Sequence, residues 1–244
     1  MKAKDLEGCF ELFSRILGEV KTPVGGGGVY SDPLVMWLMI YQRLNEGASL
    51  ARALDQFAVE GCWKLAGECK RSRERNISTN TGGYSQARAN LSASVVEETA
   101  DHLYYWMRGG VTDNLEDRLY GLDGSTVELL RSEELLKRFP SHNKRGHFPL
   151  LRILAFHHLK TGLALRPAYG AMYGKYRKGE IQLFKEMSSR LPSDAIIVAD
   201  RNFGIYAVAY VAQSAGLDVI LRLQEHRARK ILGKNPKHGI DRKV

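Results

Sequence analysis

Hydrophobic residues recur at a helical spacing through the first 110 residues of the chain. Apolar side chains return every three or four positions in several stretches, and this period predicts amphipathic helices. The expected helices cover residues 6–20, 32–44, 49–57 and 85–106, the last range as one or two helices. Asp32 and Pro33 strengthen the second helix, because Asp is a good cap and Pro suits a first turn. This part of the chain is therefore expected to be helical.

After residue 117 the pattern changes to short apolar runs separated by turn residues. Strands are expected over residues 118–122, 150–158, 163–169, 195–199 and 218–223, with helices over 179–190 and 204–215. Three early strands that can pair antiparallel, followed by alternating helix and strand, predict a mixed sheet. We expect an α+β or mixed α/β protein with a helical domain over residues 1–112 and a sheet domain over residues 113–244. Gly109 and Gly110 mark the boundary.

Two aspartates stand where predicted strands end. The segment 120–126, Tyr-Gly-Leu-Asp-Gly-Ser-Thr, predicts a short strand that delivers Asp123 to an exposed turn, and Asp200 directly follows the apolar run 195–199. Each aspartate alone has an ordinary explanation, since Asp-Gly forms turns and Asp caps helices. Together they predict a metal site, because hard cations such as Mg²⁺ and Mn²⁺ prefer carboxylate oxygen. Two such ions can clamp the attacking and leaving oxygens of a phosphodiester, so phosphoryl transfer is the leading chemistry.

Three sequence blocks carry a resemblance to a known family. They are Asn80-Thr-Gly-Gly-Tyr-Ser-Gln-Ala-Arg-Ala-Asn-Leu91, Gly121-Leu-Asp-Gly-Ser-Thr126 and Ala199-Asp-Arg-Asn-Phe203. With these blocks in this order, the chain resembles a DDE transposase of the insertion-sequence-four type, a cut-and-paste enzyme with an RNase H-like catalytic core. The resemblance implies that Asp123 and Asp200 are the first two catalytic, metal-binding aspartates. Arg201 and Phe203 then fill the positions that follow the second aspartate.

The last part of the chain departs from that family. The family's third carboxylate belongs to a Tyr-x-x-Arg-x-x-x-Glu-x-x-x-x-x-x-Lys motif on a helix downstream of the second aspartate, and no Tyr follows Tyr210 here. Glu225 is the only Glu after Asp200, and it lacks the surrounding motif. We therefore expect an RNase H-like core that is truncated and lacks its C-terminal part.

The resemblance also implies a reaction and its cofactors. Two Mg²⁺ or Mn²⁺ ions, held by Asp123, Asp200 and a Glu, would activate water to cut the phosphodiester at a transposon end. The same ions would then activate the exposed 3′-hydroxyl against target DNA. Arg201 would neutralise phosphate charge near the scissile bond. Without the Glu, we expect this chain to bind DNA and to cut it poorly or not at all.

The charge of the chain favours a polyanionic partner. The formal net charge is +9 and the pI is near 9.5, with basic clusters at residues 70–75 and 222–243. Such clusters are often only solvated faces or tails, but beside two motif aspartates they indicate DNA contact. The candidate DNA-binding residues are Arg71, Arg73, Lys144, Arg145 and Arg201. The resemblance implies double-stranded DNA as partner, both transposon ends and target, bound by a homo-oligomer on paired ends. It also implies that residues 1–112 are the DNA-binding domain and residues 113–244 the RNase H-like DDE catalytic domain.

Cysteine usage and hydropathy bear on location. Three cysteines without a Cys-x-x-Cys pair favour neither a disulfide framework nor a zinc site. The longest apolar run, residues 33–41, is too short to span a bilayer. We expect a soluble protein of the bacterial cytoplasm, associated with the nucleoid when it acts, and no membrane partner.

Two competing functions come from other classes. A haloacid-dehalogenase-like phosphatase also uses an Asp-Gly-Thr-type loop, but its nucleophilic Asp would stand at Gly121, which disfavours a phosphoenzyme route. A DNA-binding remnant or transposition inhibitor, made of an intact amino-terminal domain on an incomplete catalytic core, stays open as an alternative.

The histidines at positions 142, 147, 157 and 158 are interpreted as structural or surface residues. His157 and His158 fall in a predicted strand, so one of them is expected to point inward and the other outward.

Overall fold

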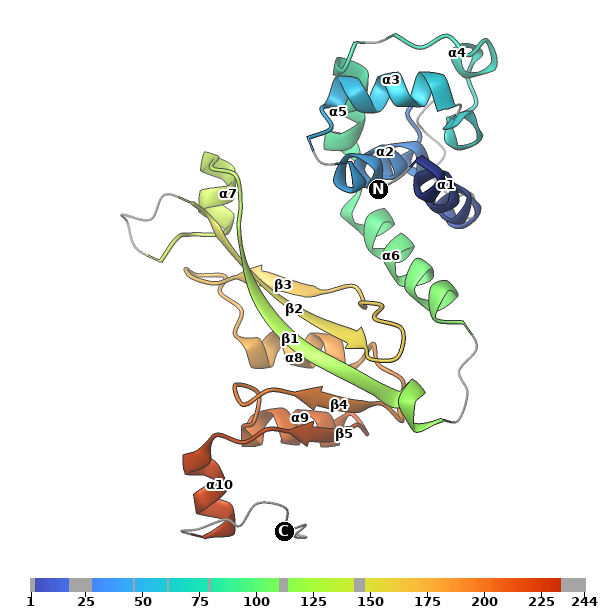
Figure 1. Cartoon of the computed structure of the whole chain (residues 1–244). Helices are drawn as coiled ribbons and strands as arrows, with labels where there is room; N and C mark the ends of the chain where they lie inside the picture. The colour runs from blue at the N-terminus through green and yellow to red at the C-terminus, as the bar shows by residue number, and fades with distance from the viewer. Residues whose placement is uncertain are drawn as a thin grey trace. The chain divides into compact units, whose positions relative to one another are not determined.

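The computed structural model describes residues 3–17, 28–45, 47–60, 62–78, 80–109, 114–142 and 148–233. The chain divides into two compact units, residues 1–106 and 107–244, and Figure 1 shows their helices and strands. The division falls inside helix α6 (Ala93–Arg108), shortly before the glycine pair at 109 and 110. Each unit buries its own set of hydrophobic side chains.

The first unit is helical. Its elements are α1 (Ala3–Leu17), α2 (Asp32–Leu44), α3 (Leu50–Glu60), the 3₁₀ turn η1 (Cys62–Leu65), α4 (Lys70–Arg73), α5 (Gly82–Asn90) and most of α6. Trp37 of α2 is buried at the centre and packs against Phe10 and Phe13 of α1, at ring-centroid distances of 5.0 and 6.0 Å. Helices this short are marginal in isolation, so burial of these apolar faces is what stabilises them.

The cap of α2 differs from the sequence prediction. The pattern indicated Asp32 as the cap, but Ser31 holds this position, and its Oγ accepts a hydrogen bond from the backbone N–H of Leu34 at 3.3 Å. The same hydroxyl donates to the carbonyl oxygen of Leu65, a contact between segments distant in sequence. Pro33 occupies the first turn, as predicted. Asp32, now inside the first turn, still interacts favourably with the helix dipole.

Tyr84, within the block 80–91, belongs to the core of the first unit. Its side chain is fully buried, and its hydroxyl donates a hydrogen bond to Gln42 Oε1 at 3.0 Å. Burial raises the pKa of Tyr84 to about 12, while the guanidinium of Arg88, 5.7 Å from the ring centroid, acts in the opposite direction. This residue of the block therefore has a structural role.

The second unit is built on a five-stranded mixed sheet, as the sequence predicts. Its strands are β1 (Leu119–Glu128), β2 (Leu150–His158), β3 (Ala168–Ala171), β4 (Ile196–Ala199) and β5 (Asp218–Leu221). Their order in the sheet is β3-β2-β1-β4-β5. The first three pair antiparallel, whereas β1, β4 and β5 run parallel. The unit also contains the 3₁₀ turn η2 (Leu115–Arg118) and helices α7 (Glu133–Arg138), α8 (Glu180–Ser188), α9 (Tyr206–Ser214) and α10 (Glu225–Leu232).

Strand β1 is longer than predicted, and this corrects the expected place of Asp123. The expected strand ends at Leu122 with Asp123 in an exposed turn, but β1 continues to Glu128. Continuous antiparallel pairing with β2 carries the chain straight through Asp123 and Gly124. Pairing with a long partner strand overrides the local preference of Asp-Gly for a turn. The third strand also differs, because it covers Ala168–Ala171 rather than residues 163–169.

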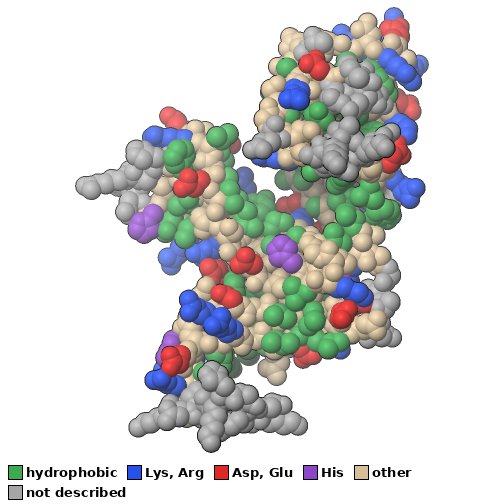
Figure 2. All heavy atoms as spheres, viewed as in Figure 1, with side chains coloured by type: hydrophobic (Ala, Val, Ile, Leu, Met, Phe, Trp, Pro, Cys, Tyr) green, Lys and Arg blue, Asp and Glu red, His purple; other side chains and the backbone are tan. Residues whose placement is uncertain are grey.

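Helices α8 and α9 cover one face of the sheet (Figure 1). Alternate strand residues such as Tyr120, Leu122 and Phe156 are buried toward these helices, and the rings of Phe156 and Phe184 lie 6.0 Å apart. The intervening residues point to the other face, where Ile220 of β5 is 56% exposed. Figure 2 shows hydrophobic side chains gathered in the region of β4 and β5. The sheet is therefore covered by helices of its own unit on one side only, among the described residues.

Candidate functional site

Asp123 and Asp200 lie next to each other in the sheet. Strands β1 and β4 pair in parallel, and their last aligned residues are Leu122 and Ala199. The residue that follows is an aspartate in both cases: Asp123 still belongs to β1, and Asp200 comes directly after the end of β4. The register therefore brings the two positions next to each other on neighbouring chain segments roughly 5 Å apart. Because Leu122 is buried toward the helices, alternation places Asp123 on the opposite face, and Asp200 is exposed where β4 ends. The structure brings these two predicted residues together.

Both carboxylates are exposed and bonded only locally. Asp123 Oδ1 accepts a hydrogen bond from the N–H of Gly124 at 2.8 Å, and Asp200 Oδ1 accepts one from the N–H of Asn202 at 2.9 Å. Neither forms an ion pair with another described residue. In the part of the chain that the structure describes, no group of three or more His, Cys, Asp or Glu side chains could hold a metal ion. The pair thus offers oxygen ligands that no described cation neutralises.

Tight packing fixes the turn that follows the second aspartate. Phe203 is 5% exposed, and its Cζ lies 3.5 Å from the point where a Cβ on Gly124 would stand. A Cβ on Gly204 would stand only 2.4 Å from the carbonyl oxygen of Arg222. Arg227 Nη1 donates a hydrogen bond to the carbonyl oxygen of Gly204 at 2.7 Å. The exposed carboxylates therefore stand on a rigid backbone, which suits a binding site.

The other predicted site residues fall in three places. Arg201 is exposed directly beside the second aspartate and makes no hydrogen bond or ion pair with a described residue. Arg71 and Arg73 are exposed on the short helix α4 of the first unit. Lys144 and Arg145 lie outside the described residues. Arg201 is thus the one predicted DNA-binding residue that the described parts of the second unit set beside the aspartate pair.

Glu225, the only Glu after the second aspartate, begins helix α10. It is exposed and forms an ion pair with Arg229, one turn further along the helix. It joins no group of potential metal ligands within the described segments. Its position gives no support for a role as third ligand.

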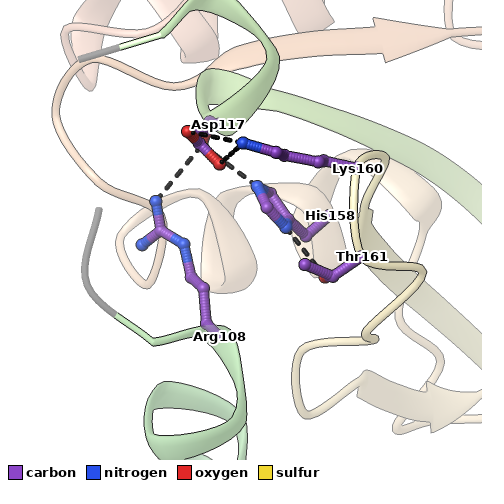
Figure 3. Close-up of polar contacts among 5 residues, drawn as sticks. All are labelled: Arg108, Asp117, His158, Lys160 and Thr161. Atoms are coloured by element: carbon purple, nitrogen blue, oxygen red, sulfur yellow. Dashed lines mark hydrogen bonds and ion pairs between the residues drawn. The ribbon is translucent and has the colours of Figure 1, made fainter. Parts of the chain in front are cut away.

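A third aspartate, Asp117, anchors a polar cluster just before the start of β1 (Figure 3). Asp117 is 8% exposed, and Lys160 Nζ lies 2.9 and 3.0 Å from its two carboxylate oxygens. The backbone carbonyl of Asp117 accepts hydrogen bonds from His158 Nε2 at 3.1 Å and from Arg108 Nη2 at 3.2 Å. His158 Nδ1 in turn lies 2.8 Å from the hydroxyl of Thr161. No sequence motif indicates this cluster, because folding alone joins residues about 40 positions apart.

His158 is a structural residue of this cluster. It is 1% exposed, and because a carbonyl can only accept, Nε2 must carry the proton that it shares with Asp117. The hydroxyl of Thr161 then donates to Nδ1, so both ring nitrogens are engaged. His157 is only half-buried on the other face of the strand. The prediction that one of the two histidines points inward is confirmed.

No known protein family, curated protein or solved structure matches this chain. None of the helices in the described ranges is long and apolar enough to cross a membrane. The functional interpretation therefore depends on the aspartate pair and its surroundings.

Proposed function

We propose that this chain is a DNA transposase of the DDE type, whose second unit uses Asp123 and Asp200 in metal-dependent cleavage and strand transfer. The observation that carries the proposal is the parallel register of β1 and β4, which sets the two aspartates side by side. Both carboxylates are exposed and no described cation pairs with them. Two adjacent negative charges repel each other, and a bound divalent cation removes that repulsion.

The sheet supports an RNase H-like core. Three antiparallel strands followed by parallel β4 and β5, in the order β3-β2-β1-β4-β5, match the mixed sheet that the resemblance implies. The face that carries Asp123 also has exposed apolar residues such as Ile220. Parallel strands are normally covered on both faces, so a segment that supplied a third carboxylate would find an apolar surface to pack on beside the pair.

The side chains present fit a hard divalent cation. Carboxylate oxygens are the donors that Mg²⁺ and Mn²⁺ prefer, and Asp123 and Asp200 would hold the metal. When bound, such an ion supplies charge stabilisation to phosphate oxygens. The guanidinium of Arg201 is exposed and free of described partners, so it would donate hydrogen bonds to a phosphate at the same edge.

Double-stranded DNA is the proposed substrate, as transposon ends and as target. The formal net charge of +9 supports a polyanionic partner. Arg71 and Arg73 of the first unit are exposed, and cations of this kind position DNA through its phosphates without reading its sequence. A homo-oligomer would hold two DNA ends together.

A DNA-binding remnant without cutting activity is the second candidate. One observation favours it, because no third acidic side chain completes the aspartate pair within the described residues. Such a remnant would bind DNA without any divalent cation. It would inhibit transposition by occupying the DNA ends.

Manganese binding, measured by electron paramagnetic resonance, tests the proposed site. Asp123→Asn and Asp200→Asn should each weaken Mn²⁺ binding about tenfold or more, because each removes one of two charged ligands. Glu128→Gln is the matched control, since Glu128 is an exposed carboxylate on the same strand. It should leave Mn²⁺ binding unchanged. Equal Mn²⁺ binding by all four proteins would remove the basis of the metal site.

Plasmid nicking then separates the two candidates. Nicking in Mg²⁺ that disappears in Asp200→Asn supports the transposase. DNA binding that persists in EDTA, with no nicking in Mg²⁺, favours the remnant.

A further inference from the structure

An apolar groove of about 490 Å³ lies between α9, the end of β5 and α10. Its lining is mainly aliphatic and includes Ile205, Ala209, Leu221, Leu223 and Ile231. All of these residues belong to the second unit. Figure 1 shows α10 beside the carboxyl end of β5, where the chain leaves the sheet. An open apolar groove of this size indicates a binding surface.

Two exposed tyrosines stand on the α9 side of the groove. Tyr206 lines it and is 82% exposed, and Tyr210, one turn further along the helix, is 57% exposed. Their rings are stacked, with centroids 6.0 Å apart and an angle of 25° between the planes. A flat pair of aromatic rings open to solvent is a surface on which another ring can stack.

The other side of the groove is positively charged. Residues 222–232 contain four Lys and Arg side chains against one Glu. That Glu, Glu225, already pairs with Arg229, so it does not neutralise the two cations that line the groove, Arg227 and Lys230. The Lys230 side chain is exposed and forms no hydrogen bond or ion pair with a described residue. The charge of the rim therefore selects an anionic partner.

The groove begins where the turn after Asp200 ends. Gly204 lines the groove, and it packs against the backbone of Arg222 as described above. Arg227, which also lines the groove, donates its hydrogen bond to Gly204. The groove is thus adjacent to the turn that follows Asp200, on the side of the sheet that α9 covers.

We propose that this groove binds unpaired bases of a nucleic-acid strand, with one base stacked on Tyr206 and its phosphate near Lys230. The inference rests on the proposed function, because the unpaired bases in the groove would belong to the DNA that is cut at Asp123 and Asp200. Stacked aromatic rings beside cations are the features that single-stranded nucleic acids need, since every base has a flat face and a phosphate. An acidic helical peptide would also match the charge, but it does not need a flat aromatic pair.

Fluorescence anisotropy with a labelled single-stranded oligothymidine tests the groove in the full chain. Tyr206→Ala should weaken binding of this probe about tenfold, because it removes one stacking surface. Tyr176→Ala is the matched control: Tyr176 is 67% exposed but does not line the groove, so its loss should change little. Lys230→Gln should weaken binding less than Tyr206→Ala and should reduce its salt dependence. Circular dichroism checks that each variant is folded.

A blunt DNA duplex, measured in parallel in EDTA, keeps this inference apart from the proposed function. Duplex binding should be nearly equal in the wild type and in Tyr206→Ala. If Tyr206→Ala binds the oligothymidine as tightly as the wild type does, while both proteins bind the duplex, the inference about the groove is wrong and the proposed function is unaffected. Failure of the oligothymidine to bind, equal effects of Tyr206→Ala and Tyr176→Ala, or displacement of the probe by polyglutamate would each overturn the inference as well.

Discussion

Charged side chains are paired with one another at the amino end of the parallel strands, whereas at the carboxyl end, among the described residues, they are not. At the amino end, Arg118 Nε donates to the carbonyl oxygen of Asp194 at 2.7 Å and also lies 3.4 Å from its carboxylate. The same guanidinium is 3.8 Å from the carboxylate of Asp218, so it links the starts of β1, β4 and β5. At the carboxyl end, Asp123 and Asp200 each accept one hydrogen bond from a backbone N–H one or two residues further along the chain.

This difference separates structural charges from charges available for function. A buried charge such as that of Asp117 costs free energy unless it is paired, so the fold surrounds it with donors. Exposed carboxylates can remain unpaired, because water solvates them. Two of them side by side gain nothing for the fold, and their repulsion costs some stability. The carboxyl end of the strands is therefore where the structure leaves ligands free for a substrate or a metal.

Gly204→Ala should have the largest effect on stability. The new Cβ would stand 2.4 Å from the carbonyl oxygen of Arg222, and backbone atoms on both sides must move to relieve this contact. Overpacking of this kind should lower the free energy of unfolding by about 3 kcal/mol, as measured by urea denaturation. Because the turn after Asp200 would shift as well, Mn²⁺ binding should weaken together with stability.

The control for this variant is Gly179→Ala, in the same unit. A Cβ on Gly179 would meet no atom within 4 Å, so the expected loss is below about 1 kcal/mol. An unchanged unfolding free energy in Gly204→Ala would show that the backbone near the aspartates yields easily. That result would contradict the rigid frame inferred for the carboxyl end.

Lys160→Met should have the next largest effect, and it tests the amino end. It leaves the carboxylate of Asp117, 8% exposed, without the cation that bonds both of its oxygens. The Lys160 side chain is itself 40% exposed, and water reaching the site limits the loss to about 2 kcal/mol. Arg229→Met breaks an exposed ion pair with Glu225 and should cost less than about 0.5 kcal/mol. Equal losses in the two variants would show that Asp117 is not a structural charge.

The sequence predicts the two aspartates at the carboxyl end of the strands, but it predicts few of the polar contacts at the amino end. Asp123 and Asp200 each follow an apolar strand pattern, and strand periodicity is a local property that the sequence displays directly. The length of β1 depends on its pairing with β2, so no local pattern shows that it passes through the Asp-Gly pair.

The polar contacts at the amino end come from tertiary structure. Lys160 reaches Asp117 over 43 positions, and Arg118 reaches Asp194 over 76, so no motif spacing relates them. The cap of α2 also depends on a tertiary contact, because Ser31 bonds Leu65, which lies 34 positions away. Local periods predict elements, whereas these contacts depend on how the elements pack.

Asp123→Asn should have the smallest effect on stability, and it sharpens the comparison most. The carboxylate is exposed and accepts one hydrogen bond from the adjacent backbone N–H, which an Asn oxygen can also accept. Removing one of two neighbouring negative charges relieves repulsion, so the free energy of unfolding should stay within about 0.5 kcal/mol of the wild type or rise slightly at low salt. Added Mn²⁺ should raise the melting temperature of the wild type more than that of the variant, because only a bound ligand stabilises the folded state. A loss above about 1 kcal/mol without metal would mean that Asp123 serves the fold, as Asp117 does.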